Sequence, residues 1–429
     1  MRNTSRVKFF AAAAVLALTA AACSDDETAT TTTAGATTTA ATGDTTPADT
    51  TPGDTTPGDT TGGTETTVAP VVGLPRTSGD QTAKVMVLTD VTQGQIAYSA
   101  PETYPAVQLA FADFPNVEVT VCDAKGDQNE YLNCQQSAID SGVNAVVVGW
   151  SAGGQAGEDA LYEAGIPVIG GGATVDPLSF AFSSGQGNYV GLGAGSVVAG
   201  GSKIGVLYLE GTDFLVDAIE RGAKSQGGEI VSRAAVPSNA PDLAPAIAKL
   251  LGDDVDMIIL SVSPPMVVQA MTAIDATGEK PLVSAVGAIL PQQLLDYLGP
   301  LAEGMFAINQ NLGNAEDSET MAELAAGVEG IQAGTALNVQ TVLGFVSGYV
   351  LATALSNVEG DVTSEALVAQ LNAVDGLDLG GMVGPVSTKP LPAAGLERFM
   401  NPYAIVYKVV DGKLVKQSEL IDVRDAFAA

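Results

Sequence analysis

The run GWSAG, from Gly149 to Gly153, is a G-x-S-x-G pattern between an apolar run and a helical stretch. In α/β-hydrolases this pattern places a nucleophilic serine on a sharp turn after a strand. Such a serine needs a base, most often histidine, that accepts its proton. The chain of 429 residues contains no histidine, and no lysine stands at a predicted strand end near Ser151. We therefore expect no enzyme, with a serine hydrolase that uses Ser151 as a minor alternative. The same glycines let backbone N–H groups approach a bound anion.

The composition also argues against metals, cofactors and nucleic acid. Without histidine the chain lacks the commonest metal ligand. Lysine and arginine number 18 against 49 aspartates and glutamates, and the formal net charge of −31 repels phosphate backbones and anionic lipid headgroups. The glycine-rich run at residues 185–191 has the wrong spacing for a dinucleotide-binding loop. We expect no metal, no cofactor and no nucleic-acid partner.

Residues 1–22 are typical of a bacterial export signal. Basic residues come first, and the apolar run at residues 9–22 is too short to remain as a membrane-spanning helix. The run ends in small residues directly before Cys23 and resembles the lipobox of bacterial lipoproteins, in which the cysteine is lipidated. The position three places before the cysteine holds Ala20 where a large aliphatic residue is usual, so cleavage of an ordinary signal peptide is the alternative.

A linker is predicted at residues 23–82, because its composition is dominated by Thr, Ala, Asp, Gly and Pro. Such a segment buries too little apolar surface to fold, and we expect it to be disordered. With a lipid on Cys23, it would tether a folded domain to the outer face of the cytoplasmic membrane. The lipid would be the chain's only membrane contact.

The rest of the chain alternates short β-branched runs with helical stretches, first over residues 84–170 and again over residues 203–309. Runs that are apolar on both faces suit parallel strands covered by helices on each side. The pattern predicts an α/β fold with two doubly wound parallel sheets, one in each of two lobes. An extended run at residues 402–415 carries a hairpin signal at Asp411-Gly412.

Cys122 and Cys134 stand at the end of a predicted strand and inside the helix that follows it. In an exported chain this arrangement predicts a disulfide, which would stabilise the fold by about 2 to 3 kcal/mol. A metal site is the weaker alternative, because no histidine completes the ligands.

Three blocks, in this order, resemble the type I periplasmic solute-binding proteins, in the Leu/Ile/Val-binding branch that serves branched-chain amino acid ABC importers. They are TDVTQ (residues 89–93), VCDAKGDQNEYLNCQQSAIDSGVNAVVVG (residues 121–149) and PVIGGGAT (residues 167–174). The resemblance covers residues 83–423 and implies two lobes, joined by a three-crossover hinge, that close on a ligand. It places residues 83–200 plus 312–379 in lobe one and residues 201–311 plus 380–429 in lobe two. It also implies a monomeric receptor that delivers a small molecule to the membrane permease of an ABC importer; a sensory lipoprotein with the same lobes is the alternative.

The ends of parallel strands select the candidate ligand-binding residues, because ligands of open α/β sheets bind at the carboxyl ends of the strands. In the family that the chain resembles, a serine and a small-x-Thr sequence hold the ligand carboxylate, and Ser151, Gly172 and Thr174 stand at the matching places. Phe214 matches an aromatic residue of the pocket, and Trp150 either stacks on a ligand ring or packs under the hinge. The full set is Thr92, Gln93, Tyr98, Trp150, Ser151, Gly172, Ala173, Thr174, Asp213, Phe214, Ser261, Ser263 and Gly287.

One departure from the family concerns the ligand. Amino-acid binders of this family carry an acidic residue, which pairs with the ligand ammonium, in the loop that corresponds to residues 285–290. Here that loop has no charge. A buried ammonium without a counter-ion costs several kcal/mol. Either another acid such as Asp213 substitutes, or the ligand is an amide, an organic acid or another small polar metabolite.

Overall fold

The computed structural model describes residues 74, 75, 77–94, 99–183 and 185–427. The expected export signal, Cys23 and Tyr98 lie outside these residues, as does most of the expected linker. Every element described below lies within residues 65–429.

The first sheet is built from short apolar strands, and its strand order is β2-β1-β3-β4-β5. All neighbouring strands run parallel, as the two-sided apolar runs predict. The strands are β1 (Ala83–Thr89), β2 (Val117–Asp123), β3 (Ala145–Val148), β4 (Val168–Gly170) and β5 (Ser179–Ala181).

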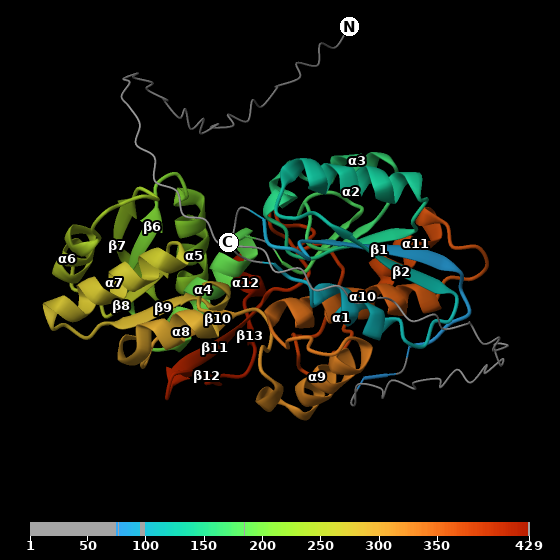
Figure 1. Ribbon diagram of the computed structural model, residues 1–429. Coiled ribbons are helices and arrows are strands. Elements are labelled where there is room, and N and C mark those ends of the chain that lie inside the picture. The colour runs from blue at the N-terminus through green and yellow to red at the C-terminus, as the bar shows by residue number, and fades with distance from the viewer. Residues whose placement is uncertain (1–73, 76, 95–98, 184, 428–429) are drawn as a thin grey trace, which may run out of the picture. The chain divides into compact units, whose positions relative to one another are not determined.

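Helices cover both faces of the first sheet (Figure 1). Helices α2 (Gln128–Asp140) and α3 (Asp159–Glu163) lie on one face, and α1 (Thr103–Ala110), α9 (Glu319–Ile331), α10 (Val339–Ser356) and α11 (Ser364–Ala373) lie on the other. The Asp127 side chain caps α2 by accepting hydrogen bonds from the backbone N–H groups of residues 129 and 130. A short 3-10 helix, η1 (Ala152–Ala156), lies between β3 and α3.

A disulfide joins Cys122 to Cys134 across a Cα–Cα distance of 5.7 Å. It ties the end of β2, an edge strand, to the middle of α2, where Cys134 is buried. The predicted disulfide is therefore confirmed.

The second sheet has the strand order β12-β11-β10-β9-β8-β6-β7, and β13 pairs with β11. Strands β6 to β10 are parallel, whereas β11 runs antiparallel to β10 and closes a hairpin with β12. Asp411 and Gly412 both have positive φ angles, of 51° and 74°, as the predicted hairpin turn requires. The strands are β6 (Lys203–Leu209), β7 (Glu229–Val236), β8 (Met257–Ser261), β9 (Leu282–Val286), β10 (Phe306–Asn309), β11 (Tyr403–Val410), β12 (Lys413–Lys416) and β13 (Ile421–Asp422).

The second sheet also carries helices on both faces (Figure 1). Helices α4 (Gly185–Val198), α5 (Asp213–Ser225) and α12 (Arg424–Phe427) form one layer. The other elements beside this sheet are α6 (Ala244–Gly252), α7 (Pro264–Thr277), α8 (Gln292–Leu298) and the 3-10 helices η2 (Gly287–Ile289) and η3 (Gly299–Ala302). The 3-10 helix η4 (Ala315–Asp317) contacts α9.

Helix α4 packs on the second sheet, although the sequence places residues 83–200 in the first lobe. It contacts β9, β10, β11 and, most extensively, α5. Glycines make this approach close: a Cβ at Gly193 would stand 2.0 Å from the Ile219 carbonyl oxygen, and one at Gly222 would stand 1.9 Å from the Val190 carbonyl oxygen. The chain therefore passes to the second sheet before residue 185 rather than near residue 200.

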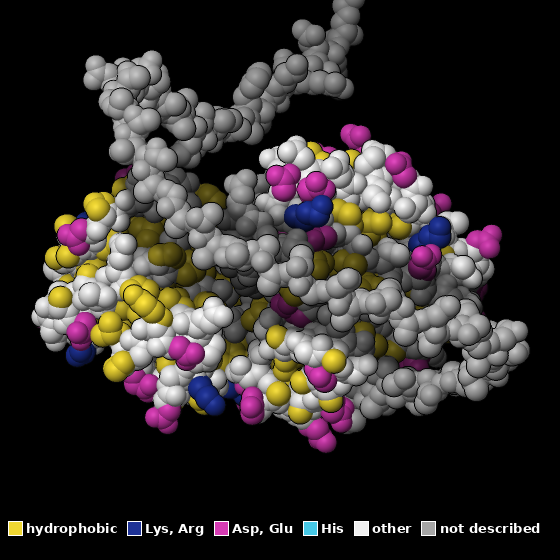
Figure 2. Space-filling view, viewed as in Figure 1, with side chains coloured by type: hydrophobic (Ala, Val, Ile, Leu, Met, Phe, Trp, Pro, Cys, Tyr) yellow, Lys and Arg dark blue, Asp and Glu magenta, His cyan; other side chains and the backbone are white. Residues whose placement is uncertain are grey.

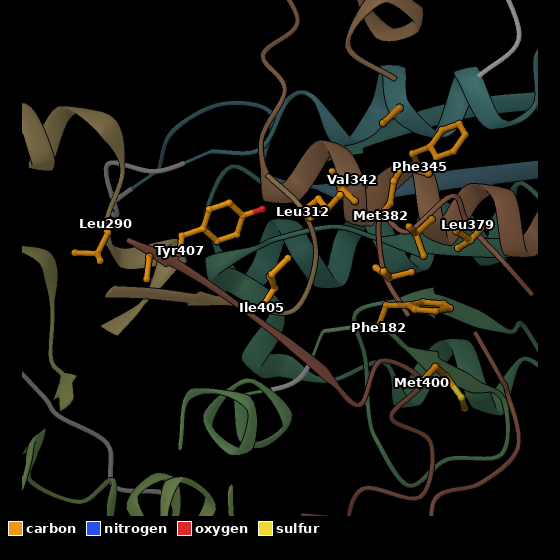
Figure 3. Close-up of a cluster of buried hydrophobic side chains, with 14 of the residues drawn as sticks. Phe182, Leu290, Leu312, Val342, Phe345, Leu379, Met382, Met400, Ile405 and Tyr407 are labelled. Atoms are coloured by element: carbon orange, nitrogen blue, oxygen red, sulfur yellow. The ribbon is translucent and has the colours of Figure 1, made fainter. Parts of the chain in front are cut away.

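Three connecting segments lie side by side where the chain passes between the sheets. The backbone N–H of Leu312 donates to the Met382 carbonyl (2.9 Å), and that of Met400 donates to the Ala181 carbonyl (2.7 Å). Figure 3 shows that Phe182, Leu312, Met382 and Met400 also contribute to one buried hydrophobic cluster. These segments are the three crossovers that the resemblance implies.

Helix α10 is the core helix of the first lobe. Among the described residues it alone has the length and hydropathy of a membrane span, and 72% of it is buried inside the protein. Its neighbours are α1, α11, β3 and β4, so packing against the first sheet accounts for its apolar character.

Candidate binding site

A cavity of about 560 Å³ opens at the carboxyl ends of β3 and β4. The loops after these strands form one wall, and the first half of α10 forms another. Phe214, at the start of α5, and Leu396, from the third crossover, reach the cavity from the side of the second sheet. The cavity thus receives side chains that belong to both sheets.

Several of the predicted ligand-binding residues line this cavity, as the strand-end rule anticipates. They are Trp150, Ser151, Gly172, Ala173, Thr174 and Phe214.

The other predicted residues lie elsewhere. The Thr92 hydroxyl donates to the Asp123 carboxylate (2.8 Å), and Gln93 is exposed. Asp213 accepts a hydrogen bond from the Tyr208 hydroxyl (2.8 Å) and does not line the cavity, and Gly287 lines a second cavity.

The two predicted serines of the second sheet differ in their surroundings. Ser261, the last residue of β8, is buried, and its hydroxyl has no hydrogen-bond partner. Ser263 is the N-cap of α7 but makes no side-chain capping bond. Neither lines the first cavity.

Ser151 is held by a buried acid. Its hydroxyl donates to one carboxylate oxygen of Asp90 (2.7 Å), and the backbone N–H of Ala152 donates to the other (2.9 Å). Asp90 follows β1 directly and is fully buried. A carboxylate of the protein itself thus occupies the donors that were expected to hold a ligand carboxylate.

The loop after β4 is fixed in a similar way. The Thr174 hydroxyl donates to the Gly395 carbonyl (2.5 Å), which ties this loop to the third crossover. Gly172 has a φ angle of 119°, and a Cβ there would stand 3.1 Å from the Tyr162 hydroxyl. The position therefore requires glycine.

Glu158 lines the cavity, and the strand-end rule did not select it. It precedes α3, only 4% of it is exposed, and it accepts hydrogen bonds from the hydroxyls of Tyr131 (2.6 Å) and Tyr162 (3.5 Å). Burial raises the pKa of Glu158, although these hydrogen bonds act in the opposite direction. The pKa of Tyr131 is also raised, by burial and then by the charge of Glu158.

The second cavity has a volume of about 650 Å³ and lies between the tips of β9 and β10, the β11–β12 hairpin and the start of α10. Two acidic residues, Glu316 and Asp317, and two basic residues, Lys413 and Lys416, line this cavity. The Tyr407 hydroxyl donates to Asp317 (2.6 Å), and a Cβ at Gly287 would collide with the Asn309 side chain.

Acidic side chains outnumber basic ones on the face drawn in Figure 2, in keeping with the net charge. Among the described residues, no group of three or more acidic, cysteine or histidine side chains is placed to hold a metal ion.

A pair of α/β sheets joined by three crossovers, with a cavity at the strand ends, defines the class of type I periplasmic binding proteins. A sequence model of the periplasmic binding protein family matches residues 82–412, and the chain belongs to this family. Its members are substrate-binding proteins of ABC transporters and not enzymes, which removes the hydrolase alternative for Ser151. A comparison with curated proteins gives no match.

Solved structures of the same fold include binding proteins of several transporters. A branched-chain amino acid ABC transporter ligand-binding protein from Burkholderia xenovorans has a TM-score of 0.68 and 14% identity, covering 81% of this chain and 97% of its own. A fatty acid ABC transporter protein from Thermomonospora curvata has a TM-score of 0.64 and 18% identity, with coverages of 82% and 96%. A Rhodopseudomonas palustris protein in complex with 3,4-dihydroxybenzoic acid has a TM-score of 0.61 and 21% identity, with coverages of 80% and 98%.

Proposed function

We propose that this protein is an extracytoplasmic receptor that captures a small polar metabolite in the first cavity and delivers it to the permease of an ABC importer. The observation that carries the proposal is the composition of the cavity wall. Trp150, Ser151 and Gly172 come from the first sheet, and Phe214 and Leu396 come from the side of the second. A ligand that contacts both sides stabilises the closed arrangement of the lobes over the open one.

The proposed lobes follow the packing of the elements. Lobe one contains the first sheet with α1 to α3 and α9 to α11, and lobe two contains the second sheet with α4 to α8 and α12. Hinge motion between them would take place in the three crossovers.

The similar structures include a branched-chain amino acid transporter protein, a fatty acid transporter protein and a solute-binding protein in complex with 3,4-dihydroxybenzoic acid. The fold therefore serves ligands of different chemistry, and the ligand of this chain has to be argued from its own cavity.

We further propose that Cys23 carries a lipid and that residues 24–82 form the tether. The support is the run of small residues before Cys23 and the composition that follows it. In a bacterial host, wild-type protein should appear in the membrane fraction and incorporate a labelled fatty acid. The Cys23→Ser variant should do neither; equal incorporation by both would contradict the anchor.

The receptor proposal can be tested by a thermal-shift screen of amino acids, amines, amides, carboxylic acids and sugars. A ligand at about one hundred times its Kd adds about 2.7 kcal/mol of stability. Any hit should also reduce the radius of gyration measured by small-angle X-ray scattering. A hit without compaction contradicts hinge closure, and a screen without any hit contradicts capture of a small metabolite.

A further inference from the structure

Most hydroxyls of the first cavity have already donated their protons to the protein. Six hydroxyl-bearing residues line it: Thr103, Tyr131, Ser151, Thr174, Ser183 and Ser347. The hydroxyls of Tyr131, Ser151, Thr174 and Ser347 donate to a carboxylate or a carbonyl of the protein, which are Glu158, Asp90, Gly395 and Leu343 respectively. Backbone carbonyls and ionised carboxylates only accept, so these four hydroxyls offer a ligand oxygen lone pairs.

Glu158 supplies charge to the same surface. Among the described residues that line the cavity, it is the only one with an ionisable acid or base other than tyrosine. Its Oε1 accepts a short hydrogen bond from Tyr131 and its Oε2 a long one from Tyr162, and the backbone N–H of Ala173 also interacts with the carboxylate. A carboxylate has about four acceptor positions, so Glu158 retains capacity for a donor from the ligand. Asp90, behind Ser151, adds a second acidic group.

One lining residue also has a buried hydroxyl without a partner. Thr103 lines the cavity, is 1% exposed, and its hydroxyl has no hydrogen-bond partner in the protein. A buried hydroxyl without a partner costs free energy, which a ligand atom would recover.

We propose that the ligand of this cavity presents a cation with several N–H donors, an ammonium or an amidinium, to Glu158, and that the tip of β3 does not serve as a carboxylate site. The inference rests on the proposed receptor function and names the chemistry of its ligand. The aromatic rings of Trp150, Tyr131 and Phe214 line the same cavity and suit a cation or its apolar body. The acid missing from residues 285–290 is thus replaced from the opposite lobe, by Glu158 and not by Asp213.

A ligand carboxylate would be unfavourable in this cavity. To donate to it, Ser151 would have to break its bond to Asp90, and the ligand charge would stand near two acids without a lysine or arginine among the described lining residues. Unpaired like charges in a partly buried site are strongly unfavourable.

The test uses two sets of ligands that share a body and differ in one group: benzamidine, benzamide and benzoate, and isopentylamine, isovaleramide and isovalerate. Titration calorimetry on the full chain should give a Kd for at least one cation that is about tenfold lower than for its amide, and no binding of either acid. Glu158→Gln keeps an acceptor for Tyr131, and it should weaken the cation about tenfold while changing the Kd of the amide less than about threefold. Glu163→Gln, at the exposed last position of α3, the helix that Glu158 precedes, is the matched control and should change neither.

A proton count separates direct pairing from a structural role. Burial raises the pKa of Glu158 and a paired cation lowers it, so cation binding at a pH below the folded pKa should release protons, which calorimetry in buffers of different ionisation enthalpy detects. Glu158→Gln should abolish this release. A cation that binds no better than its amide in both sets, or loses nothing in Glu158→Gln, overturns the inference. Tight binding and closure with an acid instead would overturn it and leave the receptor function standing.

Discussion

The two sides of the first cavity are built differently. On the first-sheet side, Asp90, Ser151, Glu158 and Tyr131 form buried hydrogen bonds in which every side chain has a partner. On the second-sheet side, Phe214 is 51% exposed, and Leu396 belongs to the hydrophobic core. Hydrogen-bonded polar side chains are therefore concentrated on one lobe, while the other lobe contributes the apolar Phe214 and Leu396 together with Gln186 of α4.

This difference means that ligand recognition and folding stability depend on the same residues on the first-sheet side. A preorganised polar surface loses little entropy when the ligand arrives, but each of its buried groups is costly to leave unpaired. Changes on the first-sheet side should therefore affect both folding and binding. Changes at the corresponding tips of the second sheet should affect folding little.

The largest effect is expected from Asp90→Ala. The substitution removes two hydrogen bonds from a fully buried carboxylate and leaves the Ser151 hydroxyl and the Ala152 N–H without their acceptor. We expect a loss of about 3 kcal/mol in the free energy of unfolding. Urea unfolding followed by tryptophan fluorescence measures it, since Trp150 is the only tryptophan and lies on this wall.

Asp213→Ala is the matched control for Asp90→Ala, because it removes an acid from the other lobe. Asp213 is exposed and accepts one hydrogen bond from Tyr208, so its loss should cost about 1 kcal/mol or less. Equal losses in the two variants would contradict the proposed difference between the two sides.

Much of this molecule is predictable from its sequence, and the reasons are local. The strand runs from residue 84 and from residue 117 match β1 and β2, because β-branched residues favour extended backbone, although β1 is buried and the edge strand β2 is only partly buried. The Asp411-Gly412 turn and the Cys122–Cys134 disulfide were also predictable, because each depends on residues that lie close together in the sequence.

The features that the sequence does not predict, such as helix α4 and the burial of Glu158, depend on tertiary contacts. The glycine-rich residues 185–198 have low helix propensity, yet they form α4 because their glycines allow close packing on α5. Glu158 was missed for a similar reason: its burial depends on Tyr131 from α2, and no local pattern marks it. The strand-end rule selects loops, whereas Glu158 lies beyond a short 3-10 helix.

The stability of the ligand-free protein should depend on pH through buried carboxyls of the first lobe. Burial raises the pKa of Glu158 and of Glu102, whose carboxylate accepts a hydrogen bond from Asn338. An acid with a raised pKa in the folded state stabilises fully below its unfolded value, near 4.5, and this stability is lost as pH rises through the folded pKa. The melting temperature should therefore fall less steeply above pH 4.5 in Glu158→Gln than in wild type. Indistinguishable pH profiles for Glu158→Gln and Glu163→Gln would contradict this assignment.

The smallest expected change in the free energy of unfolding distinguishes two serines, Ser151 and Ser263, that both precede helices. Ser151 accepts a capping bond from the Gly153 N–H (3.1 Å) and donates to Asp90, whereas Ser263 makes no side-chain capping bond. Ser151→Ala should cost about 1 to 2 kcal/mol, and Ser263→Ala less than about 0.5 kcal/mol. Both remove the same atom before a helix, so differential scanning calorimetry compares the strand tips of the two sheets at fixed chemistry. A larger loss at Ser263 would mean that the second-sheet side carries polar contacts on which the fold depends.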